Sequence, residues 1–334
     1  MPVFAQTGGN STYEFLNLSN SARIASMGGN FLAIRDHDIG LAVANPSLIS
    51  SEMHNNLGLS FVDYFDDVSY GFVTYGRDFG RIGTYAASLQ FIDYGRFKWA
   101  DETGQVLGEF NANELAFTLG WGRSLDSNFS IGANFKMIYS ALESYNSFGV
   151  AVDVAGSYHN PETRFTASLI ARNIGYQIVS YYGSNHEPLP FEIQLGLSKR
   201  LEHMPFRYSV VFTNLQKWDL TYSEPGAGTN GNGFGESSNE QSAVADFADK
   251  FMRHVVLGGE FFIGNNLSLR LGYNYQRRQE LKVDTKVSTV GFSWGFGIRV
   301  SKFHFSYARS TYHLVGSPNY ITIATNLGDF YKKK

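Results

Sequence analysis

The chain has 334 residues, carries 27 Lys and Arg against 30 Asp and Glu, and contains no cysteine. The near balance of charge leaves no basic footprint for nucleic acid, and the lack of cysteine excludes disulfides, thiolate zinc sites and cysteine nucleophiles. There are 28 Phe, 20 Tyr and 35 Gly, yet the mean hydropathy is only -0.20. No stretch approaches the roughly 18 apolar residues of a membrane-spanning helix, whereas strands with one polar and one lipid-facing side fit this composition.

The first five residues, 1–5, look like the end of an export signal. Val3 and Ala5 stand where the small residues of a signal-peptidase site are expected, which makes Gln6 the start of the mature chain. No charged or long apolar region precedes them, so an ordinary N-terminus is the alternative. We expect residues 1–5 to be a signal-peptide remnant.

Residues 6–56 do not alternate between polar and apolar positions, and they carry signals for short helices instead. Three such helices are expected, each with a capping residue in front of it: Ser21 before 22–27, Asp38 before 39–43, and Asn45 before 46–51. Gly28 suits the end of the first helix, and Pro46 suits the first position of the third. This segment therefore differs in kind from the rest of the chain.

Beyond this segment the sequence alternates with period two, as expected for strands that have two different faces. In one stretch Leu267, Leu269 and Leu271 point to one side. Ser268 and Arg270 point to the other. Fourteen strands are expected, at 57–65, 68–78, 81–94, 113–124, 129–143, 147–159, 164–173, 190–201, 206–217, 254–263, 266–278, 288–300, 302–313 and 319–328. Most of them reach the roughly 9–11 residues that a tilted strand needs to cross a bilayer, which predicts an all-β fold with a transmembrane antiparallel β-barrel over 57–330.

The connections between these strands differ in length according to their position. Those after even-numbered strands are tight, whereas several of those after odd-numbered strands are long: 95–112, 174–189, 218–253 and 279–287. This asymmetry is typical of bacterial outer-membrane barrels, whose long loops face outside the cell. A soluble β-sandwich is the alternative, but it has no reason to sort its loops in this way.

A barrel of fourteen strands is wider than the eight-stranded size that side chains can fill, so residues 6–56 are expected to form a hatch that plugs it. Six charged residues fall on the inward, polar faces of the strands: Glu114, Lys136, Glu192, Glu260, Arg270 and Arg299. Because isolated buried charges are costly, we expect them to pair with Arg23, Asp36 and Asp38 of the hatch. A hydrated lumen, in which these charges meet water, is the alternative.

The longest expected loop, 218–253, is extracellular by the same asymmetry. Residues 223–242 are rich in Gly, Asn and Ser, and residues 242–254 have the pattern of a short amphipathic helix. Aromatic residues in and near the long loops are the expected anchors for a protein partner, because aromatic side chains dominate interface cores: Tyr181, Tyr182, Trp218, Tyr222, Phe247 and Phe251. The alternative is a loop that merely shields the barrel mouth.

No constellation of residues for catalysis, for a metal or for a cofactor stands out, so we expect a protein that is not an enzyme. Segment 291–295 matches Gly-x-Ser-x-Gly, but it lies inside an alternating strand and not at the strand-to-helix turn that a nucleophile elbow needs. Segment 36–40 resembles the start of a calcium loop but lacks the remaining ligands. Helix capping is therefore favoured over a bound cation there.

Several short motifs of the N-terminal segment resemble one family when they are taken together. They are Tyr13-Glu14-Phe15-Leu16-Asn17-Leu18, Ser21-Ala22-Arg23, Met27-Gly28-Gly29, Asp36-His37-Asp38 and Asn45-Pro46-Ser47-Leu48. This run resembles the hatch of the PorV/PorQ family of the Bacteroidetes type IX secretion system, which is similar in turn to FadL-like barrels of fourteen strands. The first motif and the chain length are closer to the PorQ branch. At Ser47 the family usually has Ala, a mild departure.

The resemblance implies a multi-pass barrel of the bacterial outer membrane that serves type IX secretion as a docking platform. It implies, as partners, a PorZ-like surface protein held beside the PorU/PorV complex, which attaches secreted cargo to lipopolysaccharide, with outer-membrane lipid around the barrel and no nucleic acid. A FadL-like channel for hydrophobic small molecules is the alternative, although the inward charges argue against a continuous apolar path. A lipase-type enzyme lacks any candidate triad.

Overall fold

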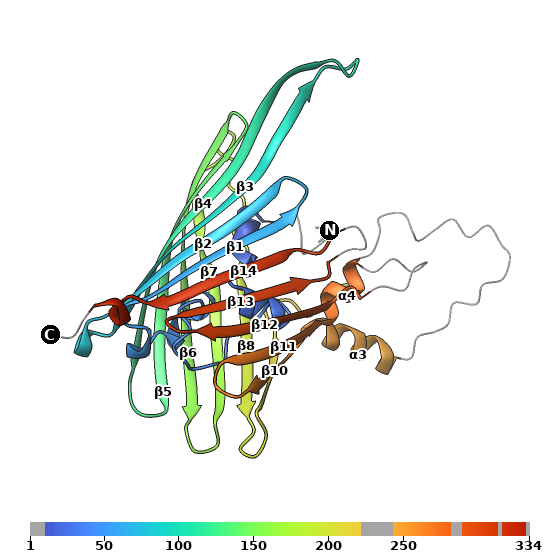
Figure 1. Ribbon diagram of the computed structural model, residues 1–334. Coiled ribbons are helices and arrows are strands. Elements are labelled where there is room, and N and C mark those ends of the chain that lie inside the picture. The colour runs from blue at the N-terminus through green and yellow to red at the C-terminus, as the bar shows by residue number, and fades with distance from the viewer. Residues whose placement is uncertain (1–10, 222–242, 282–288, 313–315, 332–334) are drawn as a thin grey trace.

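The computed structural model describes residues 11–221, 243–281, 289–312 and 316–331 (Figure 1). Within these residues the strands are β1 Asn56–Phe65, β2 Val68–Asp78, β3 Thr84–Ala100, β4 Val106–Ser124, β5 Phe129–Leu142, β6 Tyr145–Asn160, β7 Phe165–Val179, β8 Glu192–Arg200, β9 Phe206–Phe212, β10 Val255–Ile263, β11 Leu267–Asn274, β12 Phe292–Val300, β13 Phe303–Ser310 and β14 Asn319–Asn326. Each strand pairs antiparallel with its neighbours in sequence, and the pairing of β1 with β14 closes the barrel. The expected fourteen-strand barrel is therefore confirmed.

Three strands run on well beyond the predicted bounds: β3, β4 and β7. Residues 95–112, expected as a loop, continue β3 and β4, which pair as far as Ala100 opposite Val106 and project beyond the barrel as a two-stranded ribbon (Figure 1). A register shift between Asp93 and Arg96 interrupts the alternation at the base of this ribbon, which explains why it read as a loop. The third, β7, runs on to Val179.

Several strands are shorter than predicted, and the structure shows why two of them end early. The expected strand 266–278 ends at Asn274. The next residues are good helix formers and fold as helix α4, Tyr275–Leu281. The expected strand 206–217 ends at Phe212, and Asn214 just beyond it has a φ of 55°, which is incompatible with an extended strand. The later helix α3, Ala243–Arg253, lies within the predicted 242–254.

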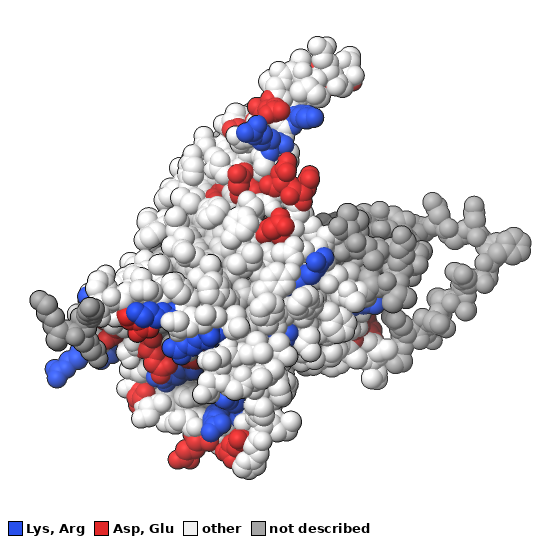
Figure 2. All heavy atoms as spheres, in the orientation of Figure 1, with Lys and Arg blue, Asp and Glu red and all other residues white. Residues whose placement is uncertain are grey.

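Alternation places apolar side chains outside the barrel and polar or small ones inside. In β5, Phe135, Met137 and Tyr139 are exposed while Asn134 and Lys136 are buried. Figure 2 shows that charged side chains gather toward the two ends of the molecule, with few in the band between them. The wall thus presents an apolar belt of the kind that faces lipid.

Residues 11–55 lie inside the barrel as a hatch of short helices. These are the 3₁₀ helix η1 Glu14–Asn17, the α-helices α1 Ala22–Ser26 and α2 Leu41–Ala44, and the 3₁₀ helices η2 Pro46–Leu48 and η3 Ser51–Met53; two more 3₁₀ turns, η4 Gly80–Ile82 and η5 Leu327–Phe330, belong to the barrel. Ser21 accepts a hydrogen bond from Ile24 N, and Asn45 accepts one from Ser47 N, as predicted for caps. Asp38 instead accepts from Gly40 N, because α2 starts two residues later than expected.

The hatch runs the length of the lumen. We call the end with the β4–β5, β8–β9 and β10–β11 turns the short-turn end, and the opposite one the long-loop end. At the long-loop end Thr12 N donates to Pro188 O at 2.9 Å, in the connection between β7 and β8. At the short-turn end Asn326 Nδ2 donates to His54 O at 2.9 Å, and the chain then enters β1.

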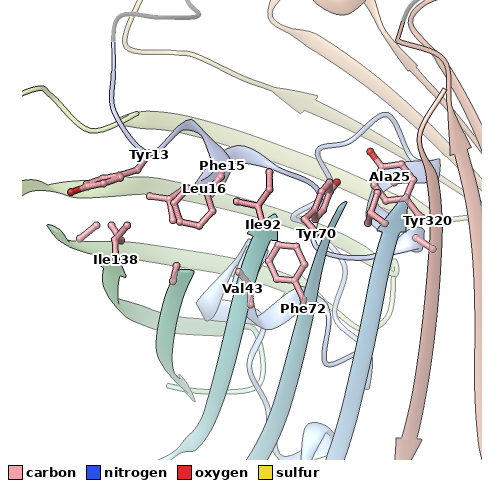
Figure 3. Packing of buried hydrophobic residues seen from close by; sticks show 14 of the residues in the cluster. Tyr13, Phe15, Leu16, Ala25, Val43, Tyr70, Phe72, Ile92, Ile138 and Tyr320 are labelled. Atoms are coloured by element: carbon pink, nitrogen blue, oxygen red, sulfur yellow. The ribbon is translucent and has the colours of Figure 1, made fainter. Parts of the chain in front are cut away.

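Close packing holds the hatch against the wall. Figure 3 shows Phe15 and Leu16 of the hatch beside Ile92 of β3, in one apolar cluster that also contains Tyr13 of the hatch and Tyr70 of β2. Elsewhere the two backbones meet at glycines: a Cβ on Gly132 would overlap Pro46, and one on Gly272 would overlap Gly28 N. The lumen is therefore shaped to the hatch.

None of the described helices combines the length and the apolar character needed to span a membrane. The predicted signal remnant, residues 1–5, and the polar stretch 223–242 lie outside the described residues.

Candidate functional site

Charged residues of the hatch and of the wall meet in one group, which we call the charge cluster. It contains Arg23, Asp36 and Asp38 from the hatch, Arg207 from β9, Glu260 from β10 and Arg270 from β11. Glu260 lies at its centre, with Arg23 and Arg207 each 3.0 Å and Arg270 2.8 Å from its carboxylate. The cluster thus ties the N-terminal segment to three strands near the C-terminal end of the chain.

The hatch side of the cluster is arranged by local structure. Helix α1 carries Arg23, whose guanidinium also reaches Asp36 at 2.8 Å and Asp38 at 3.0 Å. The second oxygen of Asp36 accepts a hydrogen bond from Asp38 N at 3.1 Å, so both carboxylates are held in a tight turn. One arginine therefore joins the turn, the first helix and the wall.

The electrostatics of the cluster are balanced, with three guanidinium groups against three carboxylates. The side chains of Glu260 and Arg270 are 1% and 2% exposed, so neither charge is satisfied by bulk water. Burial alone would raise the pKa of Asp36, but the charges of Arg23 and Arg207 hold it well below its usual range. Burial alone would lower the pKa of Arg23, but Asp36 and Glu260 raise it. Both shifts favour the ionised forms of Asp36 and Arg23.

A cavity of about 220 Å³ lies next to the cluster at the short-turn end. Its lining includes Gly264 and Asn265 of the β10–β11 turn, Lys302 of the β12–β13 turn and Asp329 from η5. Its lining mixes charged side chains of the cluster with apolar ones such as Leu267 and Phe303.

Four of the predicted inward charges do not meet the hatch charges, which corrects part of the expected pairing. Lys136 pairs with Asp153 of the neighbouring β6 at 2.8 Å, because both side chains point inward on adjacent strands. Glu114 accepts a hydrogen bond from Tyr94 at 2.6 Å, and Glu192 accepts one from Asn214 N at 3.2 Å.

The fourth, Arg299, lines the cavity at the short-turn end and pairs with no carboxylate of the described residues. It lies close to the last residue of β12, at the rim of the barrel, where water can solvate the charge. Hydration, the alternative to pairing, applies to this residue.

The two motifs that resembled catalytic or metal sites serve the packing of the hatch. Ser293, in the Gly-x-Ser-x-Gly match, donates to Ser26 O at 3.2 Å and accepts from Gly28 N at 3.1 Å. The carboxylates of segment 36–40 are turned toward Arg23. Across the described ranges no three His, Asp or Glu side chains lie close enough together to hold a metal ion.

The predicted docking aromatics do not form one surface. Tyr181 turns into the barrel mouth, where its hydroxyl donates to Ser140 Oγ at 2.6 Å, and it is therefore not a free anchor. Tyr182 is 79% exposed. Trp218, Phe247 and Phe251 gather around α3, and Tyr222 lies outside the described residues.

Two features were missed from the sequence. Arg207 falls on the inward face of β9, and its alternation with Tyr208 was a usable signal. The ribbon of β3 and β4 carries Phe97 stacked on Phe110 at 5.2 Å and the exposed Trp99, all on the face that continues the lumen side of β4. The alternation of aromatic and charged residues in 96–99 was the signal there.

A closed barrel of fourteen antiparallel strands that is filled by an N-terminal hatch has the FadL-like outer-membrane fold. Solved structures similar to this chain include the Pseudomonas putida toluene transporter TodX, at 10% identity over 92% of this chain and 96% of that one, with a TM-score of 0.55. The Ralstonia pickettii toluene transporter TbuX follows at 13% identity, 93% and 99% coverage and a TM-score of 0.53. A Pseudomonas aeruginosa FadL homologue has 9% identity, 92% and 98% coverage and a TM-score of 0.51.

These similarities concern the fold. TodX and TbuX, which share it, are named as transporters and not as enzymes. No protein-family model matches the chain. No curated protein sequence matches it either.

Proposed function

We propose that this protein lies in the outer membrane of a bacterium and serves as a docking platform of a type IX secretion system. The apolar belt and the FadL-like fold support the membrane location. We favour a docking platform over a transport channel because the hatch fills the lumen. The assignment to type IX secretion rests on the resemblance of the hatch motifs to the PorV/PorQ family, and to its PorQ branch in particular.

The closure of the lumen rests on both packing and charge. The hatch spans the barrel from Thr12 at the long-loop end to His54 at the short-turn end. Beside it lie the cavity of about 220 Å³ at the short-turn end and a cavity of about 20 Å³ next to Leu16 and Phe31, which has room for roughly one water molecule. Displacing the hatch from this part of the wall would separate Arg23 from Glu260, and that leaves buried charges unpaired.

The partner in this proposal is a PorZ-like surface protein, held at the long-loop end beside the PorU/PorV complex, with lipopolysaccharide around the barrel. Two exposed aromatic groups project there, Tyr182 after β7 and the face of the ribbon with Phe97 and Trp99. Aromatic side chains of this kind are frequent anchors of protein interfaces. The ribbon extends farthest from the barrel (Figure 1).

The experiment is a gentle purification of the tagged protein from its own membranes, followed by identification of the proteins that come with it. The proposal expects secretion-system proteins in the eluate, and it expects a strain without this protein to release secreted cargo into the medium. A FadL-type barrel that is tagged and purified from the same membranes is the control. Cargo that remains attached, together with an eluate that matches the control, contradicts the proposal.

The comparisons taken alone favour a second function, a FadL-like channel for hydrophobic small molecules, because the similar structures are named as toluene transporters and a monoaromatic hydrocarbon channel. Uptake of labelled toluene by cells that make this protein separates the two functions. The platform predicts uptake equal to that of cells with an empty vector. Saturable uptake above that level supports the channel.

A further inference from the structure

Helix α3 lies near α4 at the long-loop end of the barrel, where the chain returns from its longest loop to β10 (Figure 1). The ring centroid of Phe251 in α3 is 5.9 Å from that of Phe212, which alternates with the inward-facing Val211 and so points outward from β9. Val255 of β10 lies opposite Phe212 and points outward as well, yet it is only 6% exposed. Burial of an outward-facing residue is the expected result of a helix that packs over the wall.

The apolar face of this helix is largely exposed, and only its edge touches the wall. Val244, Phe247 and Phe251 are spaced by three and four residues, so they share one face of α3. They are 77%, 58% and 39% exposed. In a helix whose outer side meets water, the apolar stripe faces the core. Helix α3 does the reverse.

The charged face of the helix is turned toward the protein. Lys250 pairs with Asp219 at 3.1 Å, in the segment that follows β9. Asp249 accepts a hydrogen bond from the hydroxyl of Tyr275 in α4 at 2.8 Å. The side chain of Arg253, which pairs with Asp249, is only 14% exposed. These contacts fix the rotation of α3 about its own axis, so the outward apolar face is built in.

The outward face of α3 is continuous with the lipid-facing belt. The rings of Phe247 and Trp218 are 5.3 Å apart, and Phe251 reaches the wall at Phe212. Below them on the same strands, Tyr208 and Leu257 are 42% and 41% exposed and belong to the belt. One apolar surface therefore extends from the wall across the helix.

We propose that α3 is a lipid-facing helix, whose apolar face inserts among the acyl chains of the outer leaflet beside the barrel. The proposal rests on the membrane location proposed above. Amphipathic helices that lie in a membrane interface bury such a face among acyl chains and keep their charges on the other side. On this proposal Phe247 and Phe251 contact lipid instead of a protein partner. The helix then holds the start of β10 at the membrane surface.

The chain has no native cysteine, so single cysteines report on single positions. The Phe247→Cys variant is spin-labelled and reconstituted in liposomes. The collision rate of the label with oxygen, which concentrates in lipid, is compared with its collision rate with a water-soluble nickel complex. Phe135→Cys in the belt is the lipid control, and Glu102→Cys in the β3–β4 turn is the water control. A heat-modifiable band on a gel verifies that each variant folds.

The proposal expects the label at position 247 to favour oxygen, as the label at 135 does. Preference for the nickel complex, as at 102, overturns it. Poor access for both reagents also overturns it, since that indicates contact with protein, such as a second copy of the chain. If the label at 135 also fails to favour oxygen, the membrane location itself is wrong, which distinguishes that failure from a failure of α3 alone.

Discussion

Glu260 is surrounded by the guanidinium groups of Arg23, Arg207 and Arg270, and its carboxylate is almost fully buried. Glu260→Gln removes the central negative charge and leaves three cations close together. We expect the barrel to lose about 3–5 kcal/mol of stability, as is usual when one partner of a buried pair is removed. The measurement is the temperature at which the folded band converts to the unfolded band on a gel.

Glu109→Gln is the matched control, because Glu109 pairs with Arg96 at 4.0 Å on the exposed ribbon. Such surface pairs contribute under about 1 kcal/mol, so the conversion temperature should hardly move. Equal effects of the two substitutions would mean that the charge cluster does not hold the hatch.

The depressed pKa of Asp36 makes a prediction about acid. A carboxyl whose folded-state pKa lies below its unfolded value contributes stability that is present above the unfolded value and lost as the pH falls through the folded one. The stability that Asp36 contributes through Arg23 should therefore be complete at pH 5. It should begin to fall only below about pH 4, the ordinary pKa of Asp. Protease cleavage of the hatch, followed from pH 6 to pH 2, measures this. Cleavage that begins near pH 6 would contradict it.

For single residues, the sequence predicted part of the charge cluster. Alternation told which strand residues point inward, and so it identified Glu260 and Arg270. It did not predict that Lys136 pairs with Asp153, because that choice depends on the register of β5 against β6. Alternation has a period of two and carries no information about register between strands.

Among the elements, the hatch decides whether the barrel conducts ions. It fills the lumen from the long-loop end to the short-turn end, so the intact protein should show almost no conductance in a planar bilayer. Removing residues 7–55 should open a pore, because a wall of fourteen strands encloses more space than its side chains can fill. Conductance that is equal and high in both forms would contradict a plug.

The ribbon of β3 and β4 has one apolar and one charged face. Replacing Phe97 and Trp99 with Ser should lower recovery of the surface partner about tenfold or more, which is the usual effect of losing an aromatic anchor, while the barrel stays folded. Replacing Arg96 and Lys98 with Ser on the opposite face is the matched control. Co-purification from membranes is the measurement. If the control variant loses the partner equally, the aromatic face is not the docking surface.

Elements were predicted best where one physical rule dominates. Burial on one side only produces alternation, so the strands of the wall were found, and the caps Ser21 and Asn45 mark their helices. The ribbon was missed because the register shift beside Gly95 breaks the alternation. Helix α3 was predicted, but its outward apolar face depends on contacts with Asp219 and Tyr275 that no local pattern contains.

The molecule as a whole should behave as a membrane-embedded barrel. In detergent, unheated protein should migrate away from its expected mass on a denaturing gel and shift on boiling, because every strand of the closed barrel is hydrogen-bonded on both sides. Its circular dichroism spectrum should be dominated by β-structure. A monomer that stays soluble without detergent would contradict the membrane location.

The charge cluster also has a consequence for assembly. Arg23 is made early in synthesis, whereas Glu260 and Arg270 arrive only with β10 and β11. Until those strands are in place, the hatch carries an arginine without its partners in the wall, and β1 has no β14 to pair with. The complete charge cluster can therefore form only once β10 and β11 stand in the wall. A chain that stops before β10 is left with an open sheet and an unanchored hatch, both recognisable to the machinery that removes failed products.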